Sequence, residues 1–320
     1  MIFTSLLADT WHALLRRLNL QTTTSSARAA QRKSSSVTRT VSSTRSLSPS
    51  LSSTRAALPS QSQTPSQTPT PSNTRTPKNT PSGTGTPKST ATTPGIGIDW
   101  VAAGRVEAVK NQGSCGSCYA FSANAAIVSA VAIKAGAAPV TLSEQQVVDC
   151  SRPQGNAGCG GGWMANVYNY ALSAGGLCSD VAYPYTGLDT AACGKAACTA
   201  VAKITSYTNL PANSRAAVES ALLARPLAVA ITASASSFQL YSSGVYADTR
   251  CADSAGGSVN HAVLLVAYGT TASGVPFYTL QNSWGAGWGN AGRIMFARGT
   301  TYDPAGICLV QQYPSYVTAA

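Results

Sequence analysis

The sequence predicts an α+β protein whose folded part is a mainly helical half followed by a mainly β half. Residues 96–320 are rich in Gly, Ala, Val, Tyr and Cys, and they are numerous enough to bury a sizeable core. A long apolar run of helical character lies early in this region, and short β-prone runs dominate after about Ile204. We therefore expect a helical lobe over 96–205 and a β lobe over 206–320.

The first 95 residues differ in composition from the rest. From Gln21 to Pro94 nearly half of the residues are Ser or Thr, Pro recurs, and aromatic residues are absent. Such a segment buries too little apolar surface to offset its chain entropy, so we expect a disordered basic tail over 21–95. Residues 1–20 form a segment of uncertain role, with no clear signal peptide and an apolar run too short for a membrane span.

The net charge of +11 belongs to this tail. Residues 1–95 hold eleven Lys or Arg and one acid, whereas residues 96–320 hold eleven Lys or Arg and ten acids. The nearly balanced charge of the folded part gives no reason to expect nucleic-acid binding there. The dispersed charges of the tail are typical of a solvated linker.

Three helices are expected in the first half. Residues 118–135 contain no Pro or Gly and carry apolar side chains all around the helical wheel, which indicates a buried helix that ends before Gly136. Ser143 is a suitable capping residue for a second helix, with the acid Glu144 in its first turn. A third helix is expected over 164–173, after the irregular segment Gly160–Gly162, where three glycines leave room for a ligand backbone.

The second half opens with one helix, expected over 214–224, and continues with β-prone runs. These runs are bounded by Gly, Pro and Ser, as strands of a compact sheet usually are. They lie at 226–231, 261–268, 276–282 and 292–297.

All nine cysteines follow residue 114, and their odd number leaves one thiol outside any set of pairs. Four disulfides would require an oxidising compartment, either secreted or endolysosomal. A zinc site is not expected, because His261 is the only histidine of the folded part and the cysteines do not form paired CxxC knuckles. A redox CxxC is also disfavoured, because no βαβ setting follows Cys118.

Cys118 has the sequence context of an activated nucleophile. A cysteine attacks acyl carbon as a thiolate, which a helix N-terminus and a neighbouring imidazolium both favour. His261 is the candidate base, since the other histidine, His12, lies in the N-terminal segment. Asn282 ends a β-prone run and could orient the imidazole, and the side-chain amide of Gln112 could donate to an oxyanion.

These residues resemble those of the papain/cathepsin cysteine proteases. The signature C-G-[SA]-C-[WY], with His and Asn far downstream, is matched by residues 115–119. Several further motifs in the same order carry the resemblance over nearly all of 97–315. They are Asp99-Trp100, Asn111-Gln112-Gly113, Val147-Val148-Asp149-Cys150, Cys159-Gly160-Gly161-Gly162, Tyr183-Pro184-Tyr185, Asn260-His261-Ala262 and Asn282-Ser283-Trp284-Gly285-Ala286-Gly287-Trp288-Gly289.

The resemblance implies a papain-like two-lobed fold, with a helical lobe, a β-barrel-like lobe and the active cleft between them. Cys118 would lie on the helical lobe and His261 and Asn282 on the β lobe, with Gln112 in the oxyanion hole and Trp284 shielding the His261–Asn282 hydrogen bond. The implied disulfides are Cys115–Cys159, Cys150–Cys193 and Cys251–Cys308, and Cys178 and Cys198 then remain as a fourth pair.

The resemblance also assigns substrate contacts. Gly161 and Gly162 would pair with substrate backbone, and an apolar pocket would accept the side chain of the second residue before the cut. That pocket would be lined by Trp163, Met164, Ala230, Val259 and Asn260, with Trp284 nearby. Two departures stand out: Tyr119 replaces the usual Trp, and the helical inhibitory propeptide of the family is not visible in residues 1–95.

The function implied is that of a cysteine endopeptidase that works through a thioester acyl-enzyme. Exopeptidase members block the cleft, in one case with a loop carrying histidines, and a domain with one histidine cannot carry that loop. The alternatives are a catalytically inactive papain-like binding protein and an adhesin-like protein that acts through its tail. We expect polypeptide substrates, protein inhibitors as further partners, a monomer, no cofactor or metal, and a lysosomal, vacuolar or secreted location.

Overall fold

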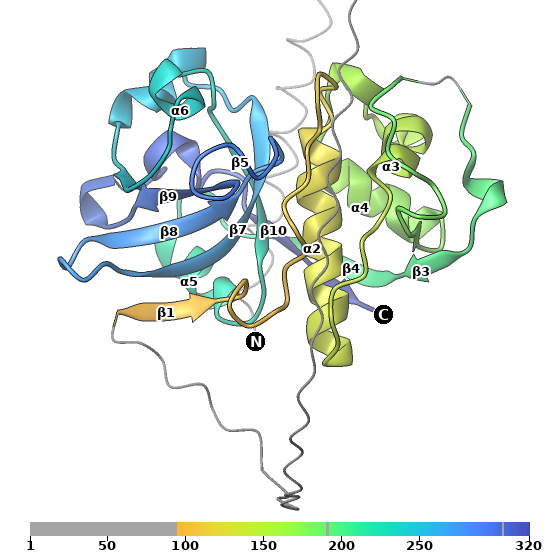
Figure 1. The fold of residues 1–320 in the computed structure, drawn as a ribbon, viewed down its shortest axis with the longest axis horizontal. Helices are drawn as coiled ribbons and strands as arrows, with labels where there is room; N and C mark the ends of the chain where they lie inside the picture. The colour runs from red at the N-terminus through yellow and green to blue at the C-terminus, as the bar shows by residue number, and fades with distance from the viewer. Residues whose placement is uncertain (1–94, 190–191, 303) are drawn as a thin grey trace, which may run out of the picture. The chain divides into compact units, whose positions relative to one another are not determined.

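The computed structural model describes residues 95–189, 192–302 and 304–320. Within this part of the chain, one long helix, α2 (Cys118–Ala135), runs between a β-rich lobe and a helical lobe (Figure 1). The expected N-terminal segment 1–20 and the expected tail 21–95 lie outside the described residues, apart from Gly95. The α+β fold class expected from the sequence is confirmed.

The elements alternate in an α+β order. The further helices are α3 (Glu144–Cys150), α4 (Met164–Ser173), α5 (Arg215–Leu222) and α6 (Ser236–Gln239). The strands are β1 (Ile96–Asp99), β2 (Leu177–Cys178), β3 (Ala200–Ala202), β4 (Ile204–Asn209), β5 (Leu227–Ile231), β6 (Val245–Tyr246), β7 (His261–Thr270), β8 (Pro276–Gln281), β9 (Arg293–Ala297) and β10 (Ser315–Ala319).

The expected helix over 118–135 is confirmed, and Gly136 ends it in the left-handed conformation with φ 62°. Every residue from 119 to 130 is buried, because the helix packs against both lobes. By length and composition α2 could cross a membrane, but 72% of it is buried inside the protein. Its apolar character is therefore explained by its place in the core.

The helical lobe packs α3 and α4 against α2. The Ser143 hydroxyl accepts a hydrogen bond from the backbone N–H of Gln146 at 2.9 Å, which confirms the expected cap of α3. The expected helix over 164–173 is also confirmed as α4. Their contact faces form one core cluster with α2, which includes the fully buried Tyr119, Leu142 and Tyr168.

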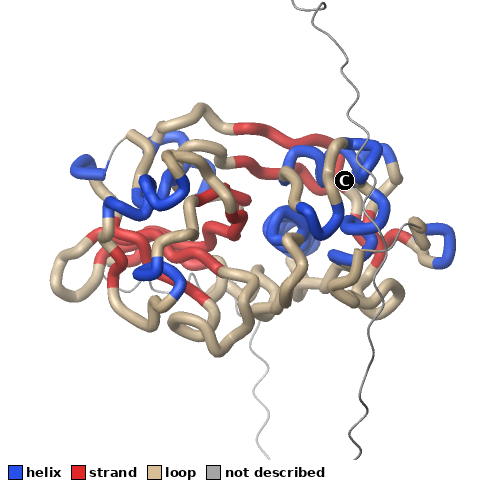
Figure 2. The backbone as a smooth tube through the Cα atoms, turned by 90° about the horizontal axis from the view of Figure 1, so that it is seen from above, coloured by secondary structure: helices blue, strands red, loops and turns tan. Residues whose placement is uncertain are grey.

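The β lobe is built on an eight-stranded sheet in the order β4-β10-β5-β7-β8-β9-β6, with β1 also paired to β7. All pairs are antiparallel except β6 with β9. A second core cluster fills this lobe, around Phe238, Tyr278 and Phe296. Seen from above, most of the strands lie on one side of α2, and the helices α3 and α4 lie on its other side (Figure 2).

Near its first and last strands, the chain does not follow the order of a helical lobe first and a β lobe second. The first strand, β1, pairs with β7 of the β lobe, and β4 pairs with the C-terminal strand β10. The strands β1, β4 and β10 were not expected. The first has only four residues, β4 is polar and largely exposed, and β10, with the sequence SYVTA, has no continuous apolar run. A lobe boundary near residue 205 stays a prediction.

Four disulfides join the described cysteines, and Cys118 alone is free. Three of them lie in the helical half and one in the β lobe. The pairs are Cys115–Cys159, Cys150–Cys193, Cys178–Cys198 and Cys251–Cys308.

Candidate active site

Cys118 is the first residue of α2, so its thiol lies at the positive end of the helix dipole. Burial raises the pKa of this thiol above its ordinary value. The backbone N–H groups of Ala262, Tyr119 and Cys118 itself act in the opposite direction, because they stabilise a thiolate. The site thus combines a half-buried thiol with neighbouring backbone N–H groups that favour its thiolate form.

His261 and Asn282 are brought together by strand pairing. His261 is the first residue of β7, and Asn282 follows the last residue of its antiparallel neighbour β8. The His261 Nε2 and Asn282 Oδ1 atoms are 2.7 Å apart, and both side chains are buried.

This hydrogen bond determines which ring nitrogen carries the proton. Asn282 Oδ1 also accepts from the backbone N–H of Ser283 at 2.8 Å, which fixes the orientation of the amide. An amide oxygen can only accept, so His261 Nε2 donates and Nδ1 is the basic nitrogen. Burial lowers the pKa of His261 to about 4, while the bond to Asn282 acts against that shift. The isolated imidazole is therefore neutral and free to accept a proton near pH 7.

Trp284 packs against the ring of His261. Its ring lies 4.9 Å from the His261 ring, centre to centre, with the two planes inclined by 33°. Phe238 and Trp288 both pack edge-on against the indole of Trp284, and they pack against each other at a tilted angle. An aromatic cluster therefore packs against the ring of His261, whose hydrogen-bonding partner Asn282 is also buried.

Gln112 enters the site from the segment before α2. Its Nε2 donates to the backbone carbonyl of Cys115 at 3.0 Å, and its Oε1 accepts from the Ser283 hydroxyl at 2.6 Å. Its backbone N–H donates to the Ser283 carbonyl at 2.8 Å, which joins this segment to the end of β8. Of the two Nε2 hydrogens, only one is used in this bond, and Gln112 lines the cleft.

A cleft of about 540 Å³ contains nearly all of the expected site residues. Cys118, His261 and Gln112 line it, and Asn282 lies behind His261, away from the cleft wall. The expected substrate contacts also line it, namely Gly161, Gly162, Trp163, Met164, Ala230, Val259, Asn260 and Trp284. The chain order of these residues is discontinuous, and the meeting of the two lobes brings them together.

Sequence reasoning missed several lining residues. Ala233, Ser234 and Gln239 follow β5 and reach the cleft through the loop and helix after that strand, and Ala262 follows His261. Ser234 accepts a hydrogen bond from the Asn260 side chain, and Asn260 Oδ1 accepts from the Ala233 N–H at 2.9 Å. Only the position of Ala262 next to His261 could have signalled such a role.

Gly161 and Gly162, the two glycines expected to contact substrate, differ in whether their backbone groups are already hydrogen-bonded. The N–H of Gly161 donates to Gly158 at 3.3 Å and its carbonyl accepts from Ala157 at 2.8 Å, so both groups are used inside the turn. Among the described residues, the N–H and C=O of Gly162 form no hydrogen bond. Gly162 therefore offers a free donor and acceptor to an extended chain in the cleft.

Comparison with known proteins places these features in a family. The sequence model of the papain family cysteine proteases matches residues 96–318. Cathepsin L of Sarcophaga peregrina is 41% identical over 219 residues, which cover 68% of this chain and 63% of that protein. Cysteine proteinase 3 of Dictyostelium discoideum gives the same identity and the same coverages. The match thus spans just under two thirds of the length of these relatives.

Solved structures agree with the sequence comparison. The bromelain protease from Ananas comosus, in complex with the E64 inhibitor, superposes with a TM-score of 0.64 at 37% identity. That match covers 70% of this chain and 98% of the bromelain chain. The ragweed allergen Amb a 11 in its proform gives a TM-score of 0.62 at 38% identity, over 69% of this chain and 65% of that chain. The chain belongs to the papain family of cysteine proteases.

Proposed function

We propose that this protein is a cysteine endopeptidase in which Cys118, His261 and Asn282 act together, with Gln112 as an oxyanion donor. The observation that carries the proposal is the free thiol of Cys118 in one cleft with the Nε2-tethered imidazole of His261. The donor set around the sulfur and the unoccupied Nδ1 give each group the role that acyl transfer requires.

In the first half of the reaction, His261 Nδ1 takes the Cys118 proton and the thiolate attacks the substrate carbonyl carbon. Burial disfavours each isolated charge, but the thiolate and imidazolium offset one another when they form as a pair. The oxyanion accepts hydrogen bonds from Gln112 Nε2 and the Cys118 backbone N–H, which typically lowers such a barrier by about 3 kcal/mol. The C–N bond then breaks, and His261 gives its proton to the leaving amine.

In the second half, the thioester on Cys118 is hydrolysed. His261 takes a proton from water, and the hydroxide equivalent attacks the thioester carbonyl. The C–S bond breaks, the acid product leaves, and Cys118 regains its proton. Asn282 holds the imidazole in one plane through both transfers, because its oxygen remains bonded to Nε2.

The substrate is an extended polypeptide that pairs with the free N–H and C=O of Gly162. An apolar side chain then faces Trp163, Met164, Ala230 and Val259, with Asn260 at the edge of that pocket. Gly161 leaves room for the backbone. Endopeptidase action is proposed because the cleft, among described residues, carries no histidine besides His261.

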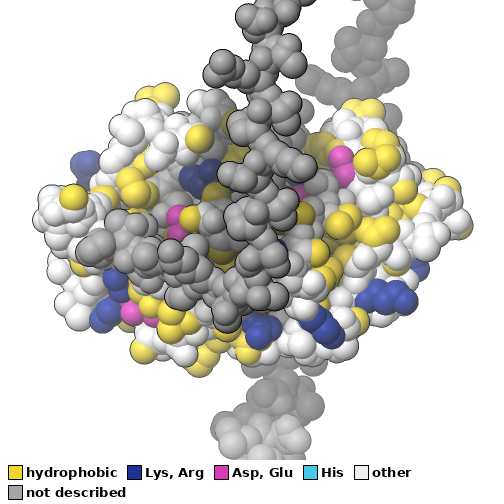
Figure 3. Space-filling model, turned by 60° about the horizontal axis from the view of Figure 1, so that its bottom comes forward, with side chains coloured by type: hydrophobic (Ala, Val, Ile, Leu, Met, Phe, Trp, Pro, Cys, Tyr) yellow, Lys and Arg dark blue, Asp and Glu magenta, His cyan; other side chains and the backbone are white. Residues whose placement is uncertain are grey.

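We place the enzyme in a lysosomal, vacuolar or secreted setting, since four disulfides persist only under oxidising conditions. Protein inhibitors that enter the same cleft are the expected partners, and the protein acts as a monomer. On the part of the face that is visible in Figure 3, Lys and Arg side chains are dispersed. No nucleic-acid partner is proposed for residues 96–320, because their charges nearly balance.

The test is hydrolysis of a fluorogenic peptide panel by the full 320-residue chain and by its Cys118→Ala variant. We expect the wild-type protein to cleave peptides with an apolar residue two places before the cut, and to require a mild reductant that keeps the thiol free. Cys118→Ala should lose at least about a thousand-fold in kcat.

A matched control is Ser129→Ala, which alters a buried α2 residue that lies outside the cleft. Equal turnover by wild type and Cys118→Ala would contradict the proposed mechanism. Binding of the panel peptides with no turnover by wild type would instead favour the inactive binding protein.

A further inference from the structure

We propose that Tyr119 and Asp189 are positioning residues that hold the substrate-pairing turn at Ala157–Gly162 from two sides. This inference rests on the proposed function, because it concerns how Gly162 is presented to an extended peptide. Neither side chain lines the cleft, so each would act through the turn.

Tyr119 supports the turn from inside the lobe. It follows Cys118 directly on α2, is fully buried, and donates its hydroxyl hydrogen to the Gly158 carbonyl at 3.0 Å. The same carbonyl receives only a long 3.3 Å bond from the Gly161 N–H within the turn. The tyrosine ring also lies 3.0 Å from the place that a side chain on Gly162 would occupy. Tyr119 thus connects the helix of the nucleophile to both ends of the turn.

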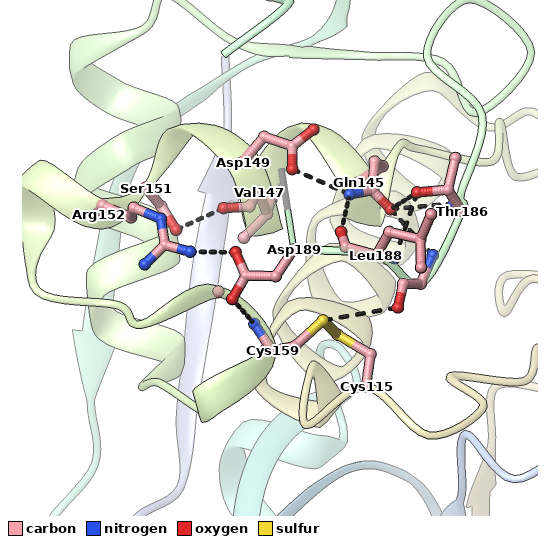
Figure 4. A network of polar contacts seen from close by, with 12 residues as sticks. Cys115, Gln145, Val147, Asp149, Ser151, Arg152, Cys159, Thr186, Leu188 and Asp189 are labelled. Carbon is pink, nitrogen blue, oxygen red and sulfur yellow. Dashed lines mark hydrogen bonds and ion pairs between the residues drawn. A yellow bond between two sulfur atoms is a disulfide. The ribbon is translucent and has the colours of Figure 1, made fainter. Parts of the chain in front are cut away.

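Asp189 supports the turn from outside. One carboxylate oxygen accepts the backbone N–H of Cys159 at 3.2 Å, and the other pairs with the guanidinium of Arg152 (Figure 4). This ion pair lies against Gly158, whose φ of 60° and lack of side chain make room for it. The hydrogen bond from Arg152 lowers the pKa of Asp189, so the carboxylate stays charged in a mildly acidic compartment.

The segment that carries Asp189 is itself anchored to the lobe. Gln145 of α3 is buried, and its Oε1 accepts from the N–H and hydroxyl of Thr186, each at 2.9 Å, and from the N–H of Gly187 at 3.1 Å. Its Nε2 donates to the Leu188 carbonyl at 2.8 Å (Figure 4). The Asp189 carboxylate is therefore presented by a fixed loop, and Cys159, which donates to it, is joined to Cys115 by a disulfide.

The geometry of this turn matters because Gly162 lines the cleft. Among the described residues 160–162, only Gly162 has both its N–H and its C=O free of hydrogen bonds, so it can pair with an extended peptide. A turn that shifts would misalign both hydrogen bonds to the peptide while leaving Cys118 and His261 in place. Loss of either support should therefore weaken binding of long peptides and spare the chemical step.

The experiment measures KM and kcat for Tyr119→Phe and Asp189→Ala on two substrates. One substrate has three residues before the cut, and the other is a simple aryl acetate ester, which carries no residue before the cut that could pair with Gly162. We expect about five-fold higher KM for the long substrate, as loss of one hydrogen bond implies, and less than two-fold change for the ester. For both substrates kcat per active site should change less than two-fold.

Active sites are counted by iodoacetamide labelling of Cys118 and mass spectrometry, and near-UV circular dichroism of each variant checks for partial unfolding, because iodoacetamide also labels unfolded chains. Tyr278→Phe removes a buried hydroxyl of the β lobe, and Asp253→Ala removes an exposed carboxylate, and both should leave KM unchanged. An unchanged KM for the long substrate, or equal changes for both substrates, would overturn the inference. Absence of turnover in the wild-type protein would instead count against the proposed function.

Discussion

The orientation of His261 depends on one buried hydrogen bond to Asn282, which is 2.7 Å long. In Asn282→Ala the ring loses the acceptor that fixes Nε2 as the protonated nitrogen, so part of the population would present the wrong tautomer to Cys118. We expect kcat to fall at least ten-fold, with KM changed less than three-fold. Steady-state kinetics on the long peptide checks this, and a kcat equal to that of wild type would contradict the role.

A substitution at Gln112 can test stabilisation of the oxyanion independently of the reactivity of the Cys118 thiol. Gln112→Ala should reduce kcat for peptide hydrolysis by about 10² to 10³-fold, because one donor to the tetrahedral intermediate is lost. Alkylation of Cys118 by iodoacetamide forms no oxyanion, so its rate should stay within three-fold of wild type. Parallel loss of both rates would mean that Gln112 acts on the thiol itself.

The buried His261 should make acid destabilise the fold. Its pKa is about 4 when folded and near 6.5 when unfolded, so the unfolded chain binds a proton that the folded chain does not. This contribution is fully present above pH 6.5 and is lost as the pH falls to about 4, by up to about 3 kcal/mol.

Chemical denaturation between pH 7 and 4.5 tests this linkage. The measurement uses Cys118→Ala and Cys118→Ala/His261→Gln, since the first variant keeps the imidazole without its thiol partner. The first should lose more unfolding free energy on acidification than the second. Identical pH dependence in the two variants would contradict the buried neutral imidazole.

The start of α3 carries a buried cluster of one cation and two acids. Lys110 Nζ lies 2.8 Å from Glu144 and 3.2 Å from Glu107. Burial disfavours the charge on Lys110, but attraction to the two carboxylates outweighs it and raises its pKa. Burial also raises the pKa of Glu107, and it raises the pKa of Glu144 to about 8, in spite of the attraction to Lys110. One ammonium therefore does not compensate two buried carboxylates at neutral pH.

Raised carboxyl pKa values stabilise the fold below pH 4.5, and this contribution is lost as the pH rises toward 8. Glu107→Gln leaves Lys110 with one carboxylate and should raise the unfolding free energy at pH 8 by about 1–2 kcal/mol, with little change at pH 4.5. Denaturant titration at the two values measures this. The exposed control Asp253→Asn should show no such difference, and a Glu107→Gln variant less stable at pH 8 would contradict the account.

Elements with a strong local signal were predictable from the sequence. The helices α2, α3 and α4 have uninterrupted or capped helical patterns, and their starts agree with Cys118, Ser143 and Met164. The strands that include His261 and precede Asn282 are apolar and bounded by turn residues. By contrast, β4 shows few buried positions, and its pairing with the distant β10 has no local signal.

The site residues also divide into those that a local motif made predictable and those that it did not. Cys118, His261, Asn282 and Gln112 lie in short motifs that could be read one by one, and the structure gathers them at the junction of the lobes. Tyr119 and Asp189 could not be recognised, because their contacts with the turn at Ala157–Gly162 depend on packing between segments far apart in the chain.

At the scale of the whole molecule, the proposed nucleophile and base lie on different lobes. Cys118 begins α2, and His261 begins the central strand β7, so neither lobe alone holds a complete site. The contact between α2 and β7 fixes the distance between them, and the Ser122 hydroxyl donates to the Val263 carbonyl across it at 2.8 Å. Four disulfides lie within the lobes and leave Cys118 as the free thiol.

The most direct test of this account is to trap the covalent intermediate. The full chain is mixed with a slowly hydrolysed peptide ester, quenched in acid within seconds, digested and mapped by mass spectrometry. The account predicts that the acyl group is found on Cys118 as a thioester. No such adduct should form in Cys118→Ala, and none should accumulate in His261→Ala. Acyl groups on another residue, or turnover by the wild-type protein in Cys118-alkylated form, would contradict it.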